Sequence, residues 1–294
     1  MGFSVIRLSA SWREIAELGW ASLDWLLEHA ASAGQPVLLT VGMKALGWPE
    51  FHLPEGVLEP DAVDVRRRAL SHVRAVVRRY RENPQLRVWQ VENEPFNRSG
   101  PRARWISRDQ VRREAGAIRQ LDSRRPLAVT TFAHFGEGLD RASSRHQSEW
   151  KRRLGLVIPA EREALAVLRQ GDILGVDVYR SIGWVDAGNT AQIARAVEDQ
   201  LEWLAGWQRI ARSQGKRFWV TESQAEPWEA RRATHANPVT VAPLDIGELV
   251  QELRGIGVER ILLWGSEYWL WRAENGDRRW LESVAALLGR RALA

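Results

Sequence analysis

The sequence predicts an α/β fold, a (β/α)8 TIM barrel in which seven β-strands are identifiable and the first is missing. Short apolar runs alternate with amphipathic helical patterns along the chain, and this alternation predicts βαβ units and a parallel sheet. The connections that follow the apolar runs are longer than those that precede them. Long loops after strands gather on one rim, and in a closed barrel that rim holds the active site.

The predicted strands have nearly continuous apolar character, as expected of parallel strands that are covered on both faces. They span residues 5–8, 37–41, 87–91, 127–132, 173–178, 218–221 and 261–264. Helical periodicity places the intervening helices near residues 20–33, 62–82, 107–122, 160–170, 190–214, 245–256 and 277–289. Each predicted strand is therefore followed by a helix, which is the repeating unit of a barrel.

The connections between these elements differ in length according to their direction. Those from helix to strand are short, at residues 33–36, 122–126 and 214–217, whereas those from strand to helix are long, at residues 42–61, 133–159 and 222–244. A doubly wound open sheet is the competing fold. Its usual phosphate-binding pattern, Gly-x-Gly-x-x-Gly, follows none of the predicted strands, so we favour the barrel.

The first predicted strand begins only a few residues after Met1. We therefore expect the chain to start at the second barrel strand, with the first strand lost or the barrel closed in a different way. We expect one barrel domain over residues 1–294. As the sequence stands the expected localisation is cytoplasmic, and secretion is the alternative if an upstream signal peptide has been lost.

The composition is that of an ordinary globular chain, with 45% hydrophobic and 27% charged residues. No apolar stretch is long enough to cross a membrane, and without cysteine there is no disulfide or thiolate metal site. The densest basic run, residues 66–81, interleaves with apolar residues at helical spacing. This pattern favours the solvent-facing side of an outer helix over a nucleic-acid surface.

Two glutamates stand at the ends of predicted strands. Asn93-Glu94-Pro95 follows the run 88–91, and Glu222 ends the run 218–221. Because the carboxyl ends of barrel strands share one rim, we expect both acids to face one site. One acid that donates a proton and one that attacks is the arrangement of retaining glycoside hydrolysis. Sixteen tryptophans also fit a carbohydrate site, since apolar sugar faces stack on aromatic planes.

Residues 89–96, Trp-Gln-Val-Glu-Asn-Glu-Pro-Phe, resemble the fourth-strand motif of clan A glycoside hydrolases, which include the family 5 cellulase-like enzymes. Residues 218–222, Phe-Trp-Val-Thr-Glu, resemble their seventh-strand motif. The resemblance covers nearly the whole chain, and it implies that Glu94 is the general acid/base and Glu222 the nucleophile. The chemistry requires a raised pKa for the acid and hydrogen-bond donors or cations around the nucleophile.

The same resemblance implies roles for four further residues. Arg7 would bond the nucleophile, and Asn93 would donate to the sugar 2-hydroxyl. Tyr179 would also bond the nucleophile, and Trp264 would form the floor of the subsite for the reacting sugar, often with a cis peptide bond after it. The structural alternatives stay open: an ordinary ion pair for Arg7, a loop cap for Asn93, and buried packing for the two aromatic residues.

The long loops add candidates for substrate contact. Trp48 and Trp228 are candidate sugar-stacking platforms, and His52 and Glu226 are candidate hydrogen-bonding partners of sugar hydroxyls. His134 follows the predicted strand 127–132 and is placed to line the cleft. Packing within the loops explains these residues equally well.

Together these patterns predict a retaining β-glycosidase acting on an oligo- or polysaccharide, with no nucleic-acid or membrane partner. The mechanism needs no metal or cofactor, and no His/Asp/Glu cluster has metal-ligand spacing. A non-catalytic carbohydrate-binding barrel and a transglycosylase with the same residues are the alternatives. The sugar, the choice between endo and exo action, and the oligomeric state do not follow from the sequence.

Overall fold

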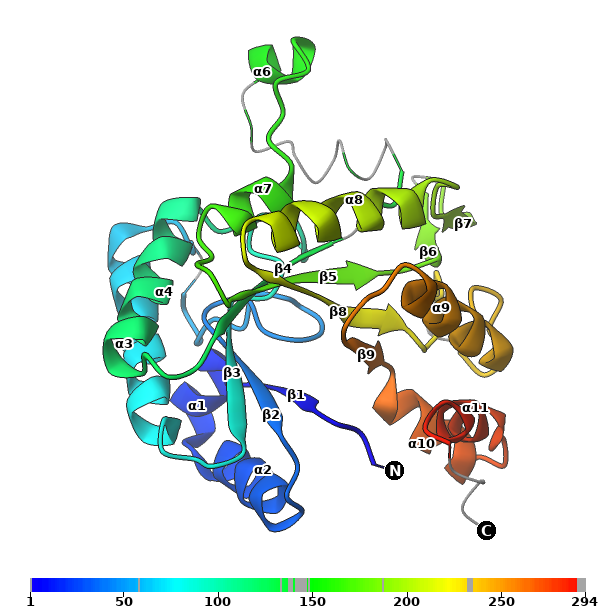
Figure 1. Cartoon of the computed structure of the whole chain (residues 1–294), viewed down its shortest axis with the longest axis horizontal. Coiled ribbons are helices and arrows are strands. Elements are labelled where there is room, and N and C mark those ends of the chain that lie inside the picture. Colours follow the sequence, from blue (N-terminus) through cyan, green and yellow to red (C-terminus); the bar gives the residue numbers. More distant parts are fainter. Residues whose placement is uncertain are drawn as a thin grey trace.

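The computed structural model describes residues 2–57, 59–132, 134–136, 140, 147, 149–186, 188–231 and 235–289. Seven parallel strands form one sheet in the order β1-β2-β3-β4-β5-β8-β9. Their bounds are Ile6–Ser9 (β1), Val37–Val41 (β2), Leu86–Val91 (β3), Leu127–Phe132 (β4), Ile173–Val178 (β5), Arg217–Gln224 (β8) and Ile261–Trp264 (β9). The sheet curls into a nearly closed barrel (Figure 1), which confirms the predicted fold class and all seven predicted strands.

Most of the helices surround this sheet, whereas the short helix at residues 149–153 projects away from it (Figure 1). The helices are α1 (Trp12–Leu18), α2 (Ala21–Ser32), α3 (Val63–Tyr80), α4 (Arg108–Leu121), α6 (Glu149–Arg153), α7 (Ala160–Leu165), α8 (Gln200–Ser213), α9 (Pro243–Gly255), α10 (Ser266–Glu274) and α11 (Arg279–Leu287). None of the helices within the described ranges combines the length and the apolar character needed to span a membrane.

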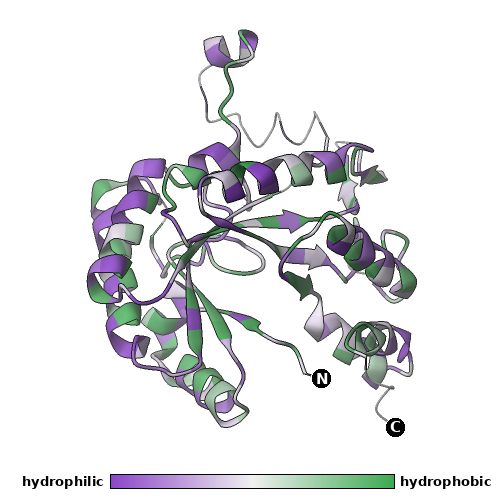
Figure 2. Cartoon of the chain, viewed as in Figure 1, coloured by the Kyte–Doolittle hydropathy of each residue, from purple (hydrophilic) through white to green (hydrophobic). Residues whose placement is uncertain are grey.

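Helix α3 shows why the outer layer forms where it does. Val65, Ala69, Val73 and Val76 recur at helical spacing and are buried against the sheet, and each such aliphatic side chain contributes roughly 1–3 kcal/mol by leaving water. The arginines of the helix lie between these positions, mostly half-buried or exposed. Figure 2 shows the resulting mixture of hydrophobic and hydrophilic colour on the outer helices and mainly hydrophobic colour on β2 and β9.

Successive inward-facing side chains divide the barrel interior into an apolar and a polar layer. Every strand or its first flank contributes to the apolar layer, which comprises Val5, Leu38, Val88, Ala128, Ile173, Trp219 and Leu262. Inward positions recur every second residue along a strand. Two residues further on, the chain therefore places Arg7, Gln90, Thr130 and Thr221 in the next layer, towards the carboxyl ends of the strands.

The sheet has two edges, β1 and β9, which are not paired with each other within the described residues. A cavity of about 670 Å³ runs along this seam and is lined by residues of both strands, including Val5, Arg7 and Leu262. Arg260 reaches across one end of the seam and donates a hydrogen bond of 2.8 Å to Ser4.

The helix expected over residues 190–214 is only partly correct. Residues 200–213 form α8, but Ala191–Arg195 is strand β7, which pairs antiparallel with β6 (Ser181–Val185). The exposed and partly buried residues of β7 alternate along the strand, a period of two rather than the 3.6 of a helix. This hairpin and the additional helices α1, α6 and α10 were not predicted.

Candidate active site

Glu222 lies within β8, and two side chains from other strands hold its carboxylate. Arg7 of β1 donates from Nη1 to Oε1 at 2.7 Å, and the hydroxyl of Tyr179, just after β5, donates to Oε2 at 2.6 Å. The Arg7 and Glu222 side chains are only 5% and 7% exposed. Charge-assisted hydrogen bonds of this kind are shorter and stronger than those between neutral groups.

Arg7 joins this carboxylate to the loop after β3. Its Nη2 donates to Oδ1 of Asn93 at 2.5 Å, and its Nε donates to Oε1 of Gln90 at 2.8 Å. Gln90 and Thr130 also donate to the Asn93 oxygen, each at 3.3 Å. The oxygen of the Asn93 amide is therefore used inside the protein, which leaves the amide nitrogen to face a ligand as a donor.

Glu94 is buried at the end of β3 with its backbone in the left-handed region, at φ +43°. Its N–H donates to Oγ1 of Thr130 at 2.9 Å, and its carbonyl oxygen accepts from Nζ of Lys44 at 2.8 Å. Few non-glycine residues adopt this conformation, and those that do are held by their surroundings and cluster at functional sites.

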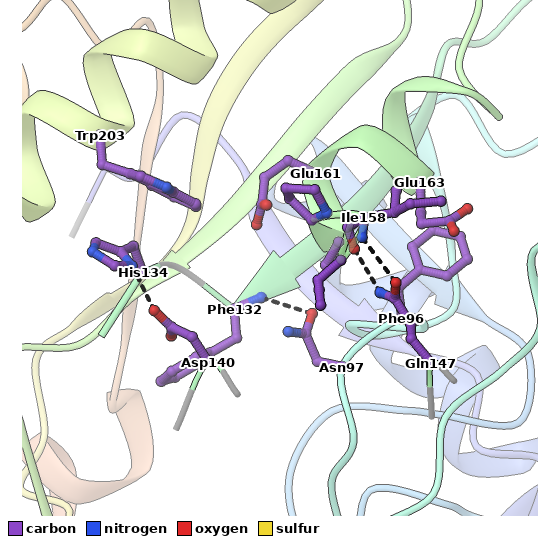
Figure 3. A pocket seen from close by; sticks show the side chains of 13 residues that line it. Phe96, Asn97, Phe132, His134, Asp140, Gln147, Ile158, Glu161, Glu163 and Trp203 are labelled. Atoms are coloured by element: carbon purple, nitrogen blue, oxygen red, sulfur yellow. Dashed lines mark hydrogen bonds and ion pairs between the residues drawn. The ribbon is translucent and has the colours of Figure 1, made fainter. Parts of the chain in front are cut away.

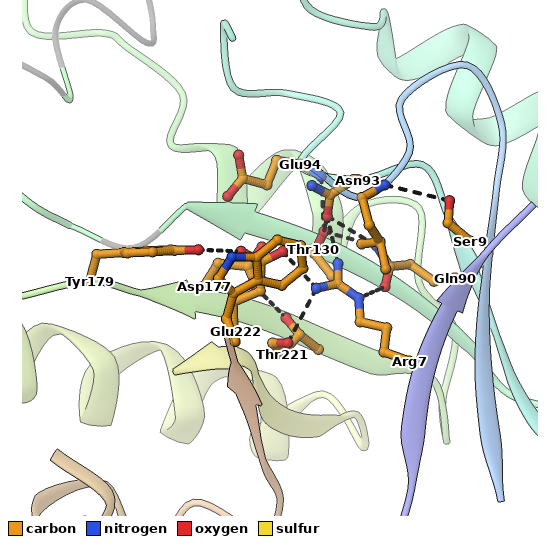
Figure 4. Close-up of polar contacts among 12 residues, drawn as sticks. Arg7, Ser9, Gln90, Asn93, Glu94, Thr130, Asp177, Tyr179, Thr221 and Glu222 are labelled. Carbon is orange, nitrogen blue, oxygen red and sulfur yellow. Dashed lines mark hydrogen bonds and ion pairs between the residues drawn. The ribbon is translucent and has the colours of Figure 1, made fainter. Parts of the chain in front are cut away.

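Burial raises the pKa of the Glu94 carboxyl well above its usual range, and the negative charges of Asp177, Glu50 and Glu222 raise it further. Lys44 opposes this effect only in part. Figure 4 shows Glu94 and Glu222 reaching from different strands into the region that also holds Asp177. The two acids thus share one site but differ in their surroundings, since Glu94 is buried beside other carboxyl groups and Glu222 accepts bonds from Arg7 and Tyr179.

Asp177 is a further buried carboxyl of the site. It lies on β5 opposite Glu222 in the β5–β8 register and accepts a hydrogen bond of 2.6 Å from Thr221. Burial, followed by the charge of Glu222, raises the pKa of Asp177 to about 8. Gly175 makes room beside it, because a Cβ there would lie 2.7 Å from Thr221 Oγ1.

Aromatic residues form a wall beside Glu222. Trp264 at the end of β9 packs against the cluster of Tyr179, Phe135 and Ile182. Trp228 meets Tyr179 edge-on at 5.2 Å between ring centroids and remains 44% exposed. The peptide bond after Trp264 is trans, so the expected cis bond is wrong; a cis bond precedes Pro49 instead.

Glu226 is tied to the same wall. Its Oε1 accepts a hydrogen bond of 2.9 Å from the Trp264 indole nitrogen, and burial raises its pKa to about 7. The loop after β2 is less closely connected. Trp48 is 69% exposed, and the His52 ring lies within 3.4 Å of Ser11 and 3.3 Å of the Gly47 carbonyl, contacts that hold the loop itself.

His134 belongs to a separate pocket of about 200 Å³ next to this site (Figure 3). Its Nδ1 lies 2.5 Å from Asp140, and its ring stacks on Trp203 at 5.4 Å between centroids. Buried Glu161 also lines the pocket. Phe132 lines this pocket and stacks on Tyr179, so one ring separates the two spaces.

Sequence reasoning missed Lys44, Glu50 and Asp177. Glu50 lies in the loop nine residues after the run 37–41, whereas Lys44 and Asp177 lie within or close after a predicted apolar strand, near its carboxyl end. That position was itself a usable signal, because a buried charge is costly unless it is paired. Of the predicted residues, the structure brings Arg7, Asn93, Glu94, Tyr179 and Glu222 together, with Trp264, Glu226 and Trp228 beside them.

Solved glycosidase structures share this fold. A β-galactosidase from the psychrophilic Marinomonas ef1 superposes with a TM-score of 0.55 at 15% identity, covering 90% of this chain and 50% of that one. Fungal β-1,4-galactanase gives 0.52 at 12% identity, covering 93% and 80%. Xylanase 10B from Thermotoga maritima gives 0.52 at 12% identity, covering 89% and 74%.

At this level of identity the likeness establishes the fold, in agreement with the resemblance to clan A glycoside hydrolases seen in the motifs. The chain spans about half the length of the Marinomonas β-galactosidase. No protein-family model matches the chain, and no curated protein sequence matches it.

Proposed function

We propose that the protein is a retaining glycoside hydrolase that cleaves β-glycosidic bonds by double displacement. In the first step Glu222 attacks the anomeric carbon while Glu94 protonates the departing oxygen. In the second step Glu94 removes a proton from water, which attacks the same carbon and releases the sugar from Glu222. This route requires carboxyl groups roughly 5–5.5 Å apart, too close for an intervening water.

The contrast between the two acids is the observation that carries the proposal. Glu222 accepts hydrogen bonds from the Arg7 guanidinium and the Tyr179 hydroxyl, which suits a nucleophile that must stay ionised. Burial and neighbouring carboxylates raise the pKa of Glu94, which suits a group that must carry a proton at neutral pH. A pair in which one acid is held by a cation and a hydroxyl donor, and the other is buried beside like charges, fits a nucleophile and an acid/base.

Other side chains fit a sugar in this site. Arg7 binds the oxygen of the Asn93 amide, so the amide nitrogen is the group that would donate to a ligand, and a donor beside the nucleophile suits the sugar 2-hydroxyl. Trp264 and Trp228 offer indole faces next to Tyr179. The names of the β-galactosidase and β-1,4-galactanase that share the fold support a β-linked substrate.

A mechanism-based label tests the proposal. Incubation with activated 2-deoxy-2-fluoro β-glycosides should add one sugar mass to the wild-type protein, at Glu222, and none to Glu222→Gln. A non-catalytic carbohydrate-binding protein would bind the sugar and take up no label. A transglycosylase would be labelled but would form larger products at high acceptor concentration. Label on a residue other than Glu222 would contradict the assignment.

The acid/base is tested with substrates of differing leaving-group pKa. Glu94→Gln should nearly abolish hydrolysis of unactivated glycosides and retain far more activity on dinitrophenyl glycosides, whose leaving group needs little protonation. Full activity on both substrate types would contradict the role of Glu94. A panel of aryl β-glycosides, β-glucan, mannan and xylan would then identify the sugar and the mode of cleavage.

A further inference from the structure

Glu92 is a buried acid that the proposed mechanism does not use. It stands two residues before Glu94, is 0% exposed, and has a left-handed backbone at φ +60°. Its two carboxylate oxygens accept hydrogen bonds from backbone N–H groups in the loop after β2, from Met43 at 2.9 Å and from Lys44 at 2.6 Å. Bonds from amides to a buried carboxylate are among the stronger ones in proteins.

Gly42 lets this carboxylate approach the loop. A Cβ at Gly42 would lie 2.2 Å from the carboxyl carbon of Glu92, far inside van der Waals contact. The position also has φ +132°, a conformation that suits glycine. The backbone of the loop after β2 and the Glu92 carboxylate are therefore in close contact, which a side chain at position 42 would prevent.

The side chain of Lys44 extends from this loop to the backbone of Glu94. Its side chain is 0% exposed, and its Nζ donates to the carbonyl oxygen of Glu94 at 2.8 Å and to that of Asn97 at 3.2 Å. Its own carbonyl accepts from the N–H of Asn93 at 3.0 Å. Glu92 thus holds the backbone of Lys44, and Lys44 holds the backbone on both sides of the Glu94 Cα.

Glu114 on α4 supports Glu92 from the outer layer. Burial and the neighbouring charge of Glu92 raise the pKa of Glu114 well above its usual range, whereas burial raises the pKa of Glu92 only to about 7, because backbone N–H groups favour its ionised form. The surroundings of Glu114 therefore favour its neutral form more strongly than those of Glu92 do. Gln110 Nε2 donates to Glu114 at 2.6 Å.

We propose that Glu92 is a positioning residue that, acting through Lys44, holds Glu94 in the strained backbone conformation from which its carboxyl reaches the leaving-group oxygen. A left-handed backbone at a non-glycine residue costs on the order of 1–3 kcal/mol and persists where surrounding bonds enforce it. The inference rests on the proposed function, because it assigns Glu92 a role through Glu94 and no contact with substrate.

The test is the dependence of kcat/KM on leaving-group pKa in Glu92→Gln. A misplaced acid fails where protonation matters, and general acid catalysis contributes roughly 10²–10⁴-fold. We expect kcat/KM to fall by at least about 10-fold for phenyl β-glycosides and by less than about 3-fold for dinitrophenyl β-glycosides, with KM little changed. A misplacement of about 1 Å is sufficient for losses of this size.

Asp172 provides a matched control. It too is a buried carboxylate that accepts two backbone N–H bonds, from Leu127 at 2.9 Å and Arg169 at 2.7 Å, but it lies just before β5 at the opposite end of the barrel. Asp172→Asn should lower the melting temperature and leave the leaving-group dependence unchanged. Glu114→Gln, which replaces a neutral acid by a neutral amide, should retain the wild-type dependence as well.

The outcomes separate the two proposals. A wild-type protein that hydrolyses none of the aryl glycosides overturns the proposed function, and this inference with it. An active wild type whose Glu92→Gln variant loses the same factor on every substrate overturns this inference alone. If Glu92→Gln does not fold, Lys44→Met removes the bond from Lys44 to the Glu94 carbonyl directly. A loss concentrated on phenyl glycosides then supports this inference, and an equal loss on every substrate overturns it.

Discussion

Replacing Arg7 by methionine is predicted to lower the free energy of unfolding by about 3–5 kcal/mol, the usual cost of removing one partner from a buried ion pair. The Arg7–Glu222 pair has an N···O distance of 2.7 Å, and its side chains are 5% and 7% exposed. The substitution also removes donors from Gln90 and Asn93. Against a total stability of roughly 5–15 kcal/mol, this loss is large.

A second substitution shows whether the uncompensated charge is the cause. In Arg7→Met the Glu222 carboxylate keeps the Tyr179 hydroxyl as a donor but loses its cation. The double variant Arg7→Met/Glu222→Met buries no charge at either position. Since apolar replacement of a buried pair is often neutral, it should recover about 2 kcal/mol or more relative to Arg7→Met alone.

Urea unfolding at pH 7, followed by tryptophan fluorescence and extrapolated linearly, measures these differences. The reference is Arg113→Met, which breaks the pair between Arg113 and Asp109 on the surface of α4, where both side chains are more than 60% exposed. That variant should lose less than about 0.5 kcal/mol. A loss below about 1 kcal/mol in Arg7→Met, or a double variant no more stable than Arg7→Met, would show that an unpaired buried charge is not the cause.

Three further predictions concern Glu94, the loop after β2 and the buried Glu161. Glu50→Gln removes a negative charge that raises the pKa of Glu94. The alkaline limb of the pH profile of kcat/KM, where Glu94 loses its proton, should therefore move to lower pH. A limb that stays in place or moves to higher pH would count against Glu94 as the acid. Gly42→Ala should lower the free energy of unfolding in urea by about 2 kcal/mol or more, because the new Cβ would clash with the Glu92 carboxyl. Gly47 has φ +78° and open space around it, so Gly47→Ala should cost only about 1 kcal/mol of backbone strain. Equal losses in the two variants would contradict the clash at Gly42. Burial raises the pKa of Glu161 from 4.5 to about 7, so its contribution to stability is fully present below pH 4.5 and is lost as pH rises through 7. The free energy of unfolding of Glu161→Gln should therefore exceed that of the wild type by roughly 2–3 kcal/mol at pH 8 and by little at pH 4. A difference that does not depend on pH would contradict this prediction.

The barrel strands could be predicted from the sequence because parallel strands covered on both faces leave continuous apolar runs. The β6–β7 hairpin could not, since Ala191–Arg195 is short and mostly solvent-exposed and lies next to the strong helical pattern of α8. Local periodicity favoured one long helix there. What decides the outcome is the pairing with Ser181–Val185, a contact between segments that the pattern of either one does not reveal.

The structure brings predicted residues together where a motif linked them to strand ends, as for Glu94, Glu222 and their partner Arg7. The predicted loop residues lie further apart. His52 binds its own loop, and His134 lies in the neighbouring pocket. Whether a loop residue faces the cleft depends on backbone turns such as that at Glu50, with φ +73°. Residue types and spacing carry little information about such turns.

Strand β1 supplies Arg7, yet within the described residues it is paired only with β2. Amide hydrogens of an edge strand exchange with solvent more readily than those of interior strands such as β4, because fewer contacts must open. A brief detachment of β1 would withdraw the guanidinium from Glu222 while the other strands stayed assembled. If the proposed function is right, hydrolysis should therefore be lost on warming before the barrel itself unfolds.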